Sequence, residues 1–175
     1  MRSSGKKTGS YDWVNESDEI VGHGPASEGH ARGLYTRSVH ILLQNLRGEV
    51  LICKRPKVKK SYPLLYTSSA GGHVEQDEKY EAAALRELEE ELGIVVPLTD
   101  AGRFDVVNDT ERAIHRLFVG KIIEAVLKTD PQEIESYRFA DLESLRRDVL
   151  EHSEIYAHPF QRALYQFISW KQGST

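Results

Sequence analysis

The segment from Tyr80 to Leu92 has apolar residues spaced for a helix that is covered on one side only. The residues that fall on its apolar face are Ala84, Leu85, Leu88 and Leu92. This spacing follows the helical repeat, and Gly93 directly after it is well placed to end the helix in a left-handed conformation. A one-sided helix needs a second layer of structure against which its apolar face is buried.

The same helix carries three glutamates at a spacing that brings their carboxylates together. Glu87, Glu90 and Glu91 are three and four residues apart, so they gather on one helical face, away from the leucines. Three like charges this close repel one another and destabilise an isolated helix. A hard divalent cation removes that penalty, and Mg²⁺ prefers carboxylate oxygens, with waters and substrate phosphates completing its coordination. Taken alone, the three glutamates also fit a solvated acidic face.

The neighbouring residues favour a site for a cation and a phosphate group. Arg86 adjoins the cluster and can orient Glu87 through a charge-assisted hydrogen bond. Gly71 and Gly72 precede the helix, and their lack of side chains lets the backbone offer a carbonyl ligand or contacts to phosphate oxygens. The residue types from Gly72 to Ile94 stand at fixed intervals that chance rarely assembles, which argues against the solvated face.

The rest of the chain alternates between strand and helix patterns. Apolar residues alternate with others from Leu34 to Leu43, and a turn at Asn45–Gly48 with a second strand at Val50–Lys54 completes a predicted hairpin. Further strands are expected at Trp13–Val14, Glu19–Val21, Arg103–Asn108, Arg116–Leu127 and Tyr137–Ala140. Mixed strands and helices without an internal repeat predict an α+β fold built in layers.

Two helices are expected near the end of the chain, at Asp141–Glu151 and Pro159–Lys171. Asp141 can cap the first of them, and a proline is tolerated in the opening turn of the second. At 175 residues the chain has room for one domain. We place that domain at residues 11–175 and expect residues 1–10, which are rich in Gly, Ser and Lys, to form a flexible N-terminal segment.

Charge and hydropathy exclude several classes of function. A net charge of −4 argues against a protein that holds nucleic acid by bulk electrostatics. The apolar runs are too short to span a bilayer, and the first residues lack the apolar region of a secretory signal. A single cysteine, Cys53, excludes an internal disulfide, and its apolar neighbours predict a buried structural thiol. We therefore expect a cytoplasmic protein without a nucleic-acid or membrane partner.

Positive charge is concentrated in the run from Lys54 to Lys60. This run is either a solvated loop or the rim of a site that attracts an anionic small molecule such as a phosphate ester. Arg55 is the candidate substrate-binding residue within it.

The pattern from Gly72 to Ile94 resembles the Nudix box, the signature of the Nudix hydrolase superfamily, at each of its fixed positions. A weaker similarity extends from the hairpin at Tyr35–Arg55 to Asp130–Leu145. The resemblance implies an α/β/α sandwich around a mixed sheet. It also implies hydrolysis of a nucleoside diphosphate linked to another moiety, with Mg²⁺ or Mn²⁺ and attack of water on phosphorus. Asp77 stands where many members have glycine, and we expect it to change the loop conformation but not the ligands.

The resemblance also implies a role for each residue of the box. Glu87, Glu90 and Glu91 would bind the metal, with the Gly71 carbonyl completing the protein ligands, and Arg86 would act in catalysis by orienting Glu87. The supporting residues are Gly72, Glu78 and Gly93. The carboxylate that takes a proton from water varies across the superfamily. The candidates here are Glu90, Glu91 and Glu133, the last of which lies in a loop that resembles a functional loop of several members.

A finer likeness points to isopentenyl-diphosphate isomerases and to the bacterial Nudix hydrolases related to them. It is carried by the run from Tyr62 to His73, and Trp13–Glu16 resembles the hydrolase group. His73 matches a metal-binding histidine of the isomerases and is a candidate substrate contact. However, the isomerase cysteine aligns with Gly71, and the later catalytic glutamate of the isomerases falls near His115. A complete box without that acid favours hydrolysis over isomerisation, and also over a non-catalytic nucleotide-binding domain.

The sequence therefore predicts a Mg²⁺-dependent hydrolase of the Nudix type that cleaves a phosphoanhydride bond in a small diphosphate substrate. Specificity in this superfamily resides in loops outside the box. The substrate thus stays open between a nucleoside triphosphate, a nucleotide sugar, a dinucleotide and an isoprenoid diphosphate. Members with extra N-terminal strands often pair, so a homodimer is also compatible with the sequence.

Overall fold

The computed structural model describes residues 9–123 and 127–173. A mixed β-sheet lies at its centre, with the strand order β5-β4-β3-β8-β7, while β6 pairs with β3 and β9 pairs with β4. The strands of this sheet are β3 (Thr36–Gln44), β4 (Val50–Lys54), β5 (Tyr66–Thr67), β6 (Ala70–His73), β7 (Leu98–Val107), β8 (Arg112–Lys121) and β9 (Ser136–Ala140). β3 and β8 run parallel, and the other pairs in the sheet are antiparallel.

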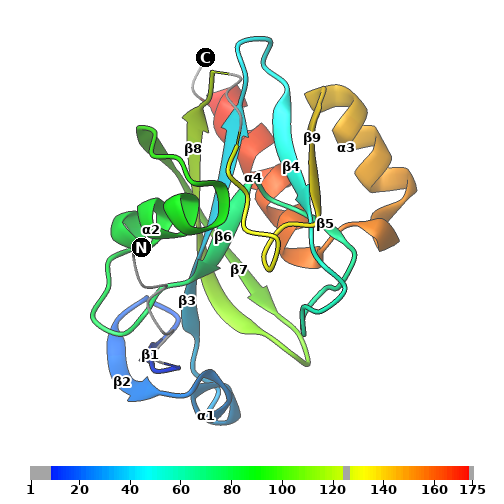
Figure 1. Cartoon of the computed structure of the whole chain (residues 1–175). Coiled ribbons are helices and arrows are strands. Elements are labelled where there is room, and N and C mark those ends of the chain that lie inside the picture. Colours follow the sequence, from blue (N-terminus) through cyan, green and yellow to red (C-terminus); the bar gives the residue numbers. More distant parts are fainter. Residues whose placement is uncertain (1–8, 124–126, 174–175) are drawn as a thin grey trace.

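Helices cover both faces of the sheet, as expected for an α/β/α sandwich (Figure 1). Helix α2 (Tyr80–Leu92) packs on one face, while α3 (Leu142–Glu151) and α4 (His158–Gly173) pack on the other, joined by the short helix η1 (Ser153–Ile155). The predicted cap of α3 is confirmed, because the Asp141 side chain accepts a hydrogen bond from the Ser144 backbone N–H at 2.9 Å. Among the described residues, no helix is both long and apolar enough to cross a membrane.

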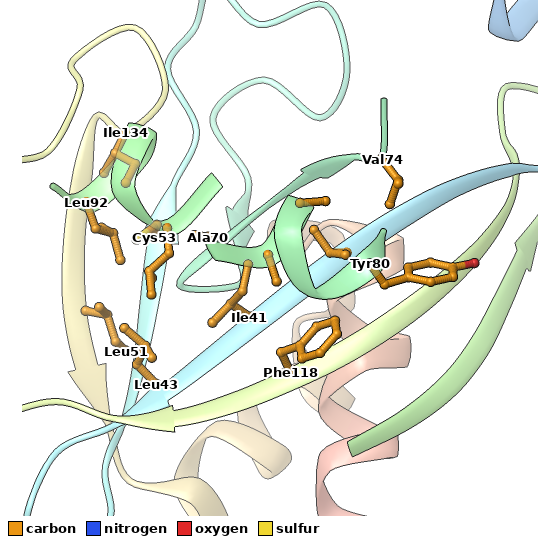
Figure 2. Packing of buried hydrophobic residues seen from close by; sticks show 14 of the residues in the cluster. Ile41, Leu43, Leu51, Cys53, Ala70, Val74, Tyr80, Leu92, Phe118 and Ile134 are labelled. Carbon is orange, nitrogen blue, oxygen red and sulfur yellow. The ribbon is translucent and has the colours of Figure 1, made fainter. Parts of the chain in front are cut away.

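The core beneath α2 confirms most of the predicted apolar pattern. Val39, Ile41 and Leu43 of β3 are buried against α2, and Figure 2 shows Ile41 and Leu43 near Leu51, Phe118 and Leu92. The expected apolar face of α2 is wrong at one position. Leu85 is 40% exposed, since the helix turns its buried side toward β6 and β3 through smaller residues, which are Ala83 and Ala84.

The predicted hairpin is present, but its strands separate almost at once. The turn closes through a hydrogen bond from the Asn45 N–H to the Glu49 carbonyl, and the strand register pairs Gln44 with Val50 alone. From there β6 takes the place of β4 beside β3, with Ser38 opposite His73 and Ile41 opposite Ala70. The sheet therefore forks at this point. The pair β3–β6 forms one branch, the pair β4–β5 forms the other, and a space remains between the two branches.

A small N-terminal unit packs beside the main sheet. It contains β1 (Tyr11–Val14), β2 (Ile20–Gly24) and α1 (Ala26–Ala31), and its centre is the buried Trp13. The helix α1 is absent from the sequence-based prediction because it is short and polar, with Gly29 as its one buried residue. Contact with Trp13 explains that glycine, since a Cβ at Gly29 would come within 2.5 Å of the indole ring.

The predicted strand boundaries differ from the observed ones on the β7–β8 hairpin. β7 begins at Leu98, five residues before the predicted start, and β8 begins at Arg112 and ends at Lys121, earlier than predicted at both ends. Charged side chains alternate with apolar ones along this hairpin only in part, so side-chain periodicity locates its ends poorly. Residues 124–126 and most of the predicted flexible segment at 1–10 lie outside the described residues.

Candidate metal centre and active site

The structure places the three glutamates of α2 in different environments. Glu87 is 1% exposed and Glu91 is 9% exposed, whereas the side chain of Glu90 is 41% exposed. The three were expected to face away from the packed side of the helix, and for Glu87 and Glu91 this is wrong. The Glu87 carboxylate fits beneath α2 because the backbone facing it, at Gly72, has no side chain. A Cβ at Gly72 would lie 2.3 Å from Glu87 Oε1.

Arg86 links these carboxylates into one network, as the sequence predicts. Its Nε and Nη2 donate to the two oxygens of Glu78 at 2.8 and 2.9 Å, and its Nη1 donates to Glu87 Oε1 at 2.7 Å. Nη1 also lies 3.5 Å from Glu90 Oε2, and Nη2 donates to the His73 carbonyl at 3.0 Å. The hydrogen bonds to Glu78 and then Glu87 raise the pKa of Arg86 against the opposing effect of burial. Arg86 thereby fixes the loop, β6 and α2 relative to one another.

Glu78 supports the site from the loop ahead of α2. It also accepts a hydrogen bond from the Glu75 N–H at 2.9 Å. Burial acts to raise the pKa of Glu78, but the bonds from Arg86 and Glu75 outweigh it and hold that pKa below its usual value. Beside it, Asp77 has φ +62°, a left-handed conformation that glycine favours and that Asp tolerates. The aspartate therefore keeps a glycine-like backbone here, contrary to the expected change of loop conformation.

Gly71 turns its backbone toward α2. It stands opposite His40 in the β3–β6 register, and its N–H donates to Glu91 Oε1 at 3.4 Å. In an antiparallel strand, the N–H and C=O of one residue point to the same side. The Gly71 carbonyl is thus directed away from β3, on the side of Glu91. Gly93 is remote from these contacts and ends α2 with φ +66°, where a Cβ would lie 2.9 Å from Lys128 Cβ.

The oxygen atoms gathered around α2 and β6 fit a hard divalent cation as ligands, although the side chains alone do not form a complete metal site. Within residues 9–123 and 127–173, no three His, Cys, Asp or Glu side chains converge closely enough to hold a metal ion. Arg86 supplies the positive charge that now balances Glu78 and Glu87. The available donors are carboxylate and carbonyl oxygens, which are the ligands that Mg²⁺ prefers, and waters or substrate oxygens would have to complete its coordination.

A cavity of about 420 Å³ lies in the fork of the sheet, and Glu91 is the glutamate of α2 that lines it. Gly71, Gly72 and Glu91 line one side of it. Other predicted site residues that line it are Arg55, His73 and Glu133. Lys59 also lines the cavity and forms an ion pair with Glu133, and the His73 ring lies 5.0 Å from the Tyr11 ring. Part of the basic run at Lys54–Lys60 is therefore a cavity rim, and the fold brings Glu133 to the same space as Glu91.

Another part of the cavity wall holds polar residues that sequence reasoning did not select for the site. Glu111 directly precedes β8 and His115 lies within it, with His115 Nε2 3.2 Å from Glu111 Oε1, and the Tyr62 hydroxyl lies 3.4 Å from Glu111 Oε2. Burial acts to raise the pKa of Glu111, but its contacts with His115, His73 and Tyr62 lower that pKa overall. The sequence does hold a signal, a Glu and a His four residues apart. In a strand, however, this spacing does not indicate which other segments of the chain lie next to Glu111 and His115.

His40, on β3, contributes a neutral imidazole to this wall. Its Nδ1 lies 2.7 Å from the Ser68 hydroxyl oxygen, and its ring is 5.2 Å from the His115 ring. The ring lines the cavity, and its partial removal from solvent lowers its pKa well below the usual 6.5, with a further contribution from His115 and Arg55. The native state therefore disfavours the charged form of His40.

This lowered pKa predicts that stability falls as the pH drops below about 6.5. The unfolded chain then takes up a proton at His40 that the native state does not, so the free energy of unfolding decreases by at most about 1.4 kcal/mol per pH unit. Urea unfolding of the wild type and of His40→Gln at pH 7.5 and 5.5 measures the effect, and the variant should lose less stability over this range. His152→Gln, at an exposed histidine, is the control. Equal losses of stability between pH 7.5 and 5.5 in the wild type and in His40→Gln would contradict the conclusion that the lowered pKa of His40 causes the effect.

Comparisons with known proteins agree with the geometry of the site. Residues 34–160 match the model of the NUDIX domain family. The chain is 38% identical over 128 residues to an uncharacterized Nudix hydrolase of Pseudomonas aeruginosa, covering 73% of this chain and 75% of that protein. It is 30% identical over 139 residues to a prenyl-diphosphate phosphatase of Methanosarcina mazei, covering 78% and 81%. An isopentenyl-diphosphate Delta-isomerase of Nocardia farcinica is 39% identical over 92 residues, covering 52% and 53%.

Solved structures share the fold. The crystal structure of DR0079 from Deinococcus radiodurans matches with a TM-score of 0.77 at 24% identity, covering 90% of this chain and 98% of that one. A MutT protein from Methanosarcina mazei matches with a TM-score of 0.65 at 26% identity, covering 77% and 94%. The sandwich fold, the glutamates of α2 and the match over most of the chain lead to the same conclusion, which is that this chain belongs to the Nudix hydrolase family.

Proposed function

We propose that this chain is a Mg²⁺-dependent hydrolase of a phosphoanhydride bond in a small diphosphate substrate. The observation that carries the proposal is the position of two buried carboxylates of α2: Glu87 lies against the side-chain-free Gly72, and Glu91 lies beside Gly71 at the wall of a cavity with a basic rim. Carboxylate and carbonyl oxygens beside a cavity with a basic rim are the ligands that Mg²⁺ prefers when substrate phosphates complete its coordination, so this arrangement favours a site that a divalent ion occupies during turnover.

The residues of α2 and β6 would hold the ion. Its protein ligands would be Glu87, Glu90, Glu91 and the Gly71 carbonyl. When bound, Mg²⁺ neutralises charge on the diphosphate and lowers the pKa of a bound water. Glu78 holds Arg86 through the bidentate contact already described, and Arg86 Nη1 in turn donates to Glu87 Oε1. This orients the Glu87 carboxylate before substrate arrives.

The cavity supplies the substrate contacts and a base. Arg55 and Lys59 would bind phosphate oxygens from the β4–β5 loop, with His73 as a neighbouring contact. Two carboxylates that line the cavity, Glu91 and Glu133, are the candidates that accept the proton of the attacking water. Glu133 is held by its ion pair with Lys59, so binding of a phosphate group to that lysine would free Glu133 for this role.

Two features favour hydrolysis over isomerisation. The position of the isomerase cysteine is Gly71, where a Cβ would lie 2.6 Å from the Val39 carbonyl oxygen, so no side chain fits there. Cys53 lies at the cavity wall but is 1% exposed and donates to the Ser69 carbonyl at 3.2 Å. Burial raises the pKa of this thiol far above its usual value, so it stays protonated and unreactive. The expected structural role of Cys53 is thus supported.

A substrate panel with and without Mg²⁺ tests this function. The panel holds nucleoside triphosphates, ADP-ribose, dinucleotides and isopentenyl diphosphate, the last because of the related prenyl-diphosphate phosphatase. We expect release of phosphate or of a nucleoside monophosphate from at least one compound, and its loss when EDTA removes the metal. Binding of a panel compound without any cleavage would overturn the hydrolase and favour a binding domain. Sedimentation of the same preparation decides whether the chain forms the homodimer that its N-terminal strands allow.

A further inference from the structure

The wall of the cavity formed by β8 carries a histidine whose ring nitrogens make no hydrogen bond. The side chain of His115 is 2% exposed, and neither Nδ1 nor Nε2 has a hydrogen-bond partner among the described residues. Its Nε2 is within ion-pair distance of Glu111 Oε1, at 3.2 Å, but is not aligned with it as a hydrogen bond. Buried polar groups nearly always have a partner in a native protein, and an exception calls for a ligand, a water or a function.

The His115 ring is held in place and cannot turn freely to find a partner. It stacks on Phe104 with ring centroids 4.9 Å apart and planes inclined by 6°, and the His40 ring lies 5.2 Å away. His40 is itself engaged by the Ser68 hydroxyl group. The two ring nitrogens of His115 are therefore held at the cavity wall without a hydrogen-bond partner among the described residues. Such an arrangement is typical of a binding site that is organised before the ligand arrives.

The neighbouring carboxylate restricts what this wall can bind. Glu111 has Tyr62 and His115 on its two oxygens, and all three residues line the cavity. A carboxylate repels phosphate oxygens and accepts hydrogen bonds from O–H or N–H groups. Arg55 and Lys59, which line the same cavity, would bind the diphosphate instead. The group that meets Glu111 and His115 is thus part of the organic moiety of the substrate, and it brings hydrogen-bond donors.

We propose that Glu111 and His115 form a subsite that binds hydroxyl groups of the substrate, so that the chain acts on the diphosphate of a sugar or a similar polyol. This inference rests on the proposed function and specifies its substrate class. A hydrocarbon chain in the same place would leave both His115 nitrogens buried without a hydrogen-bond partner and would add no donor to the Glu111 carboxylate. Sites built for hydroxyl groups reject analogues that lack them for this reason.

A comparison of the kinetics of polar and hydrocarbon substrates tests the subsite. We compare kcat/KM for ADP-ribose and UDP-glucose with that for isopentenyl diphosphate in the wild type, Glu111→Gln and His115→Gln. The two variants should lose about tenfold or more in kcat/KM for the sugar compounds relative to isopentenyl diphosphate, mainly through KM. Glu154→Gln is the matched control, because Glu154 lies 3.9 Å from His152 in an exposed pair outside the cavity.

A binding measurement separates failure of the subsite from failure of the hydrolase. The ¹⁵N imidazole signals of His115, assigned by their loss in His115→Gln, should shift when ADP-ribose or UDP-glucose is added without Mg²⁺. Isopentenyl diphosphate should shift them less. If the wild type hydrolyses nothing but these signals shift, the hydrolase is wrong and the subsite stands. Wild-type preference for isopentenyl diphosphate, an equal loss for all three substrates, or no shift with either sugar compound would overturn the subsite.

Discussion

Replacing Glu90 with glutamine should reduce turnover of the best substrate about a thousandfold while leaving the fold intact. If Glu90 is a metal ligand, the loss of its charge removes several kcal/mol of transition-state stabilisation, and each 1.4 kcal/mol corresponds to about tenfold in rate. Its side chain is 41% exposed, and its distance to Arg86 is long, at 3.5 Å. The substitution should therefore change the free energy of unfolding in EDTA by less than about 0.5 kcal/mol.

Thermal unfolding provides the second measurement for Glu90→Gln. An ion that binds only the native state raises the midpoint of unfolding by mass action, so Mg²⁺ should stabilise the wild type more than this variant. Glu89→Gln is the matched control, because it makes the same change of charge one residue away on the exposed surface of α2. Full turnover in Glu90→Gln, together with an unchanged response to Mg²⁺, would remove Glu90 from the metal site.

Replacing Arg86 with methionine should destabilise the protein by about 2 to 3 kcal/mol and abolish most of its activity. The change leaves the nearly buried carboxylate of Glu87 without its partner at 2.7 Å, and uncompensated buried charges are costly. Because Arg86 is 23% exposed, we place the effect below that of a fully buried pair. Urea unfolding in EDTA measures the loss. Arg86→Lys should recover only part of it, since an ammonium group lacks the planar fork that grips both oxygens of Glu78.

A double variant shows whether the cost comes from the buried charge. Arg86→Met combined with Glu87→Gln should be more stable than Arg86→Met alone, because the neutral amide has no charge to bury. The control is Arg146→Met, which breaks an exposed ion pair of 3.2 Å with Glu143 and should cost less than about 0.5 kcal/mol. Wild-type stability in Arg86→Met would mean that the network around Arg86 does not hold the site together.

The pattern of residues from Gly72 to Ile94 predicted most of the local structure around the glutamates. Helical spacing located α2, Gly93 marked its end, and the contact of Arg86 with Glu87 followed from their adjacency on the chain. These features depend on residues close in sequence, where periodicity and local hydrogen bonding decide the conformation. The same reasoning could not predict β6, because its two glycines show no alternation of side chains.

The burial of the glutamates of α2 and the shape of the cavity depend on contacts between segments that are distant in the sequence. Glu87 is buried because β6 passes beneath α2 with no side chain at Gly72, and Glu91 is buried beside the backbone N–H of Gly71, which the helix pattern alone does not reveal. Glu111 and His115 reach the cavity because β8 pairs in parallel with β3, and Glu133 reaches it through a loop far along the chain. The sequence by itself determined the chemistry of the site, since the residue types and their spacing are local. Only the tertiary structure decided which charged side chains are buried and which residues line the cavity, because strand pairing and the fork of the sheet set those positions.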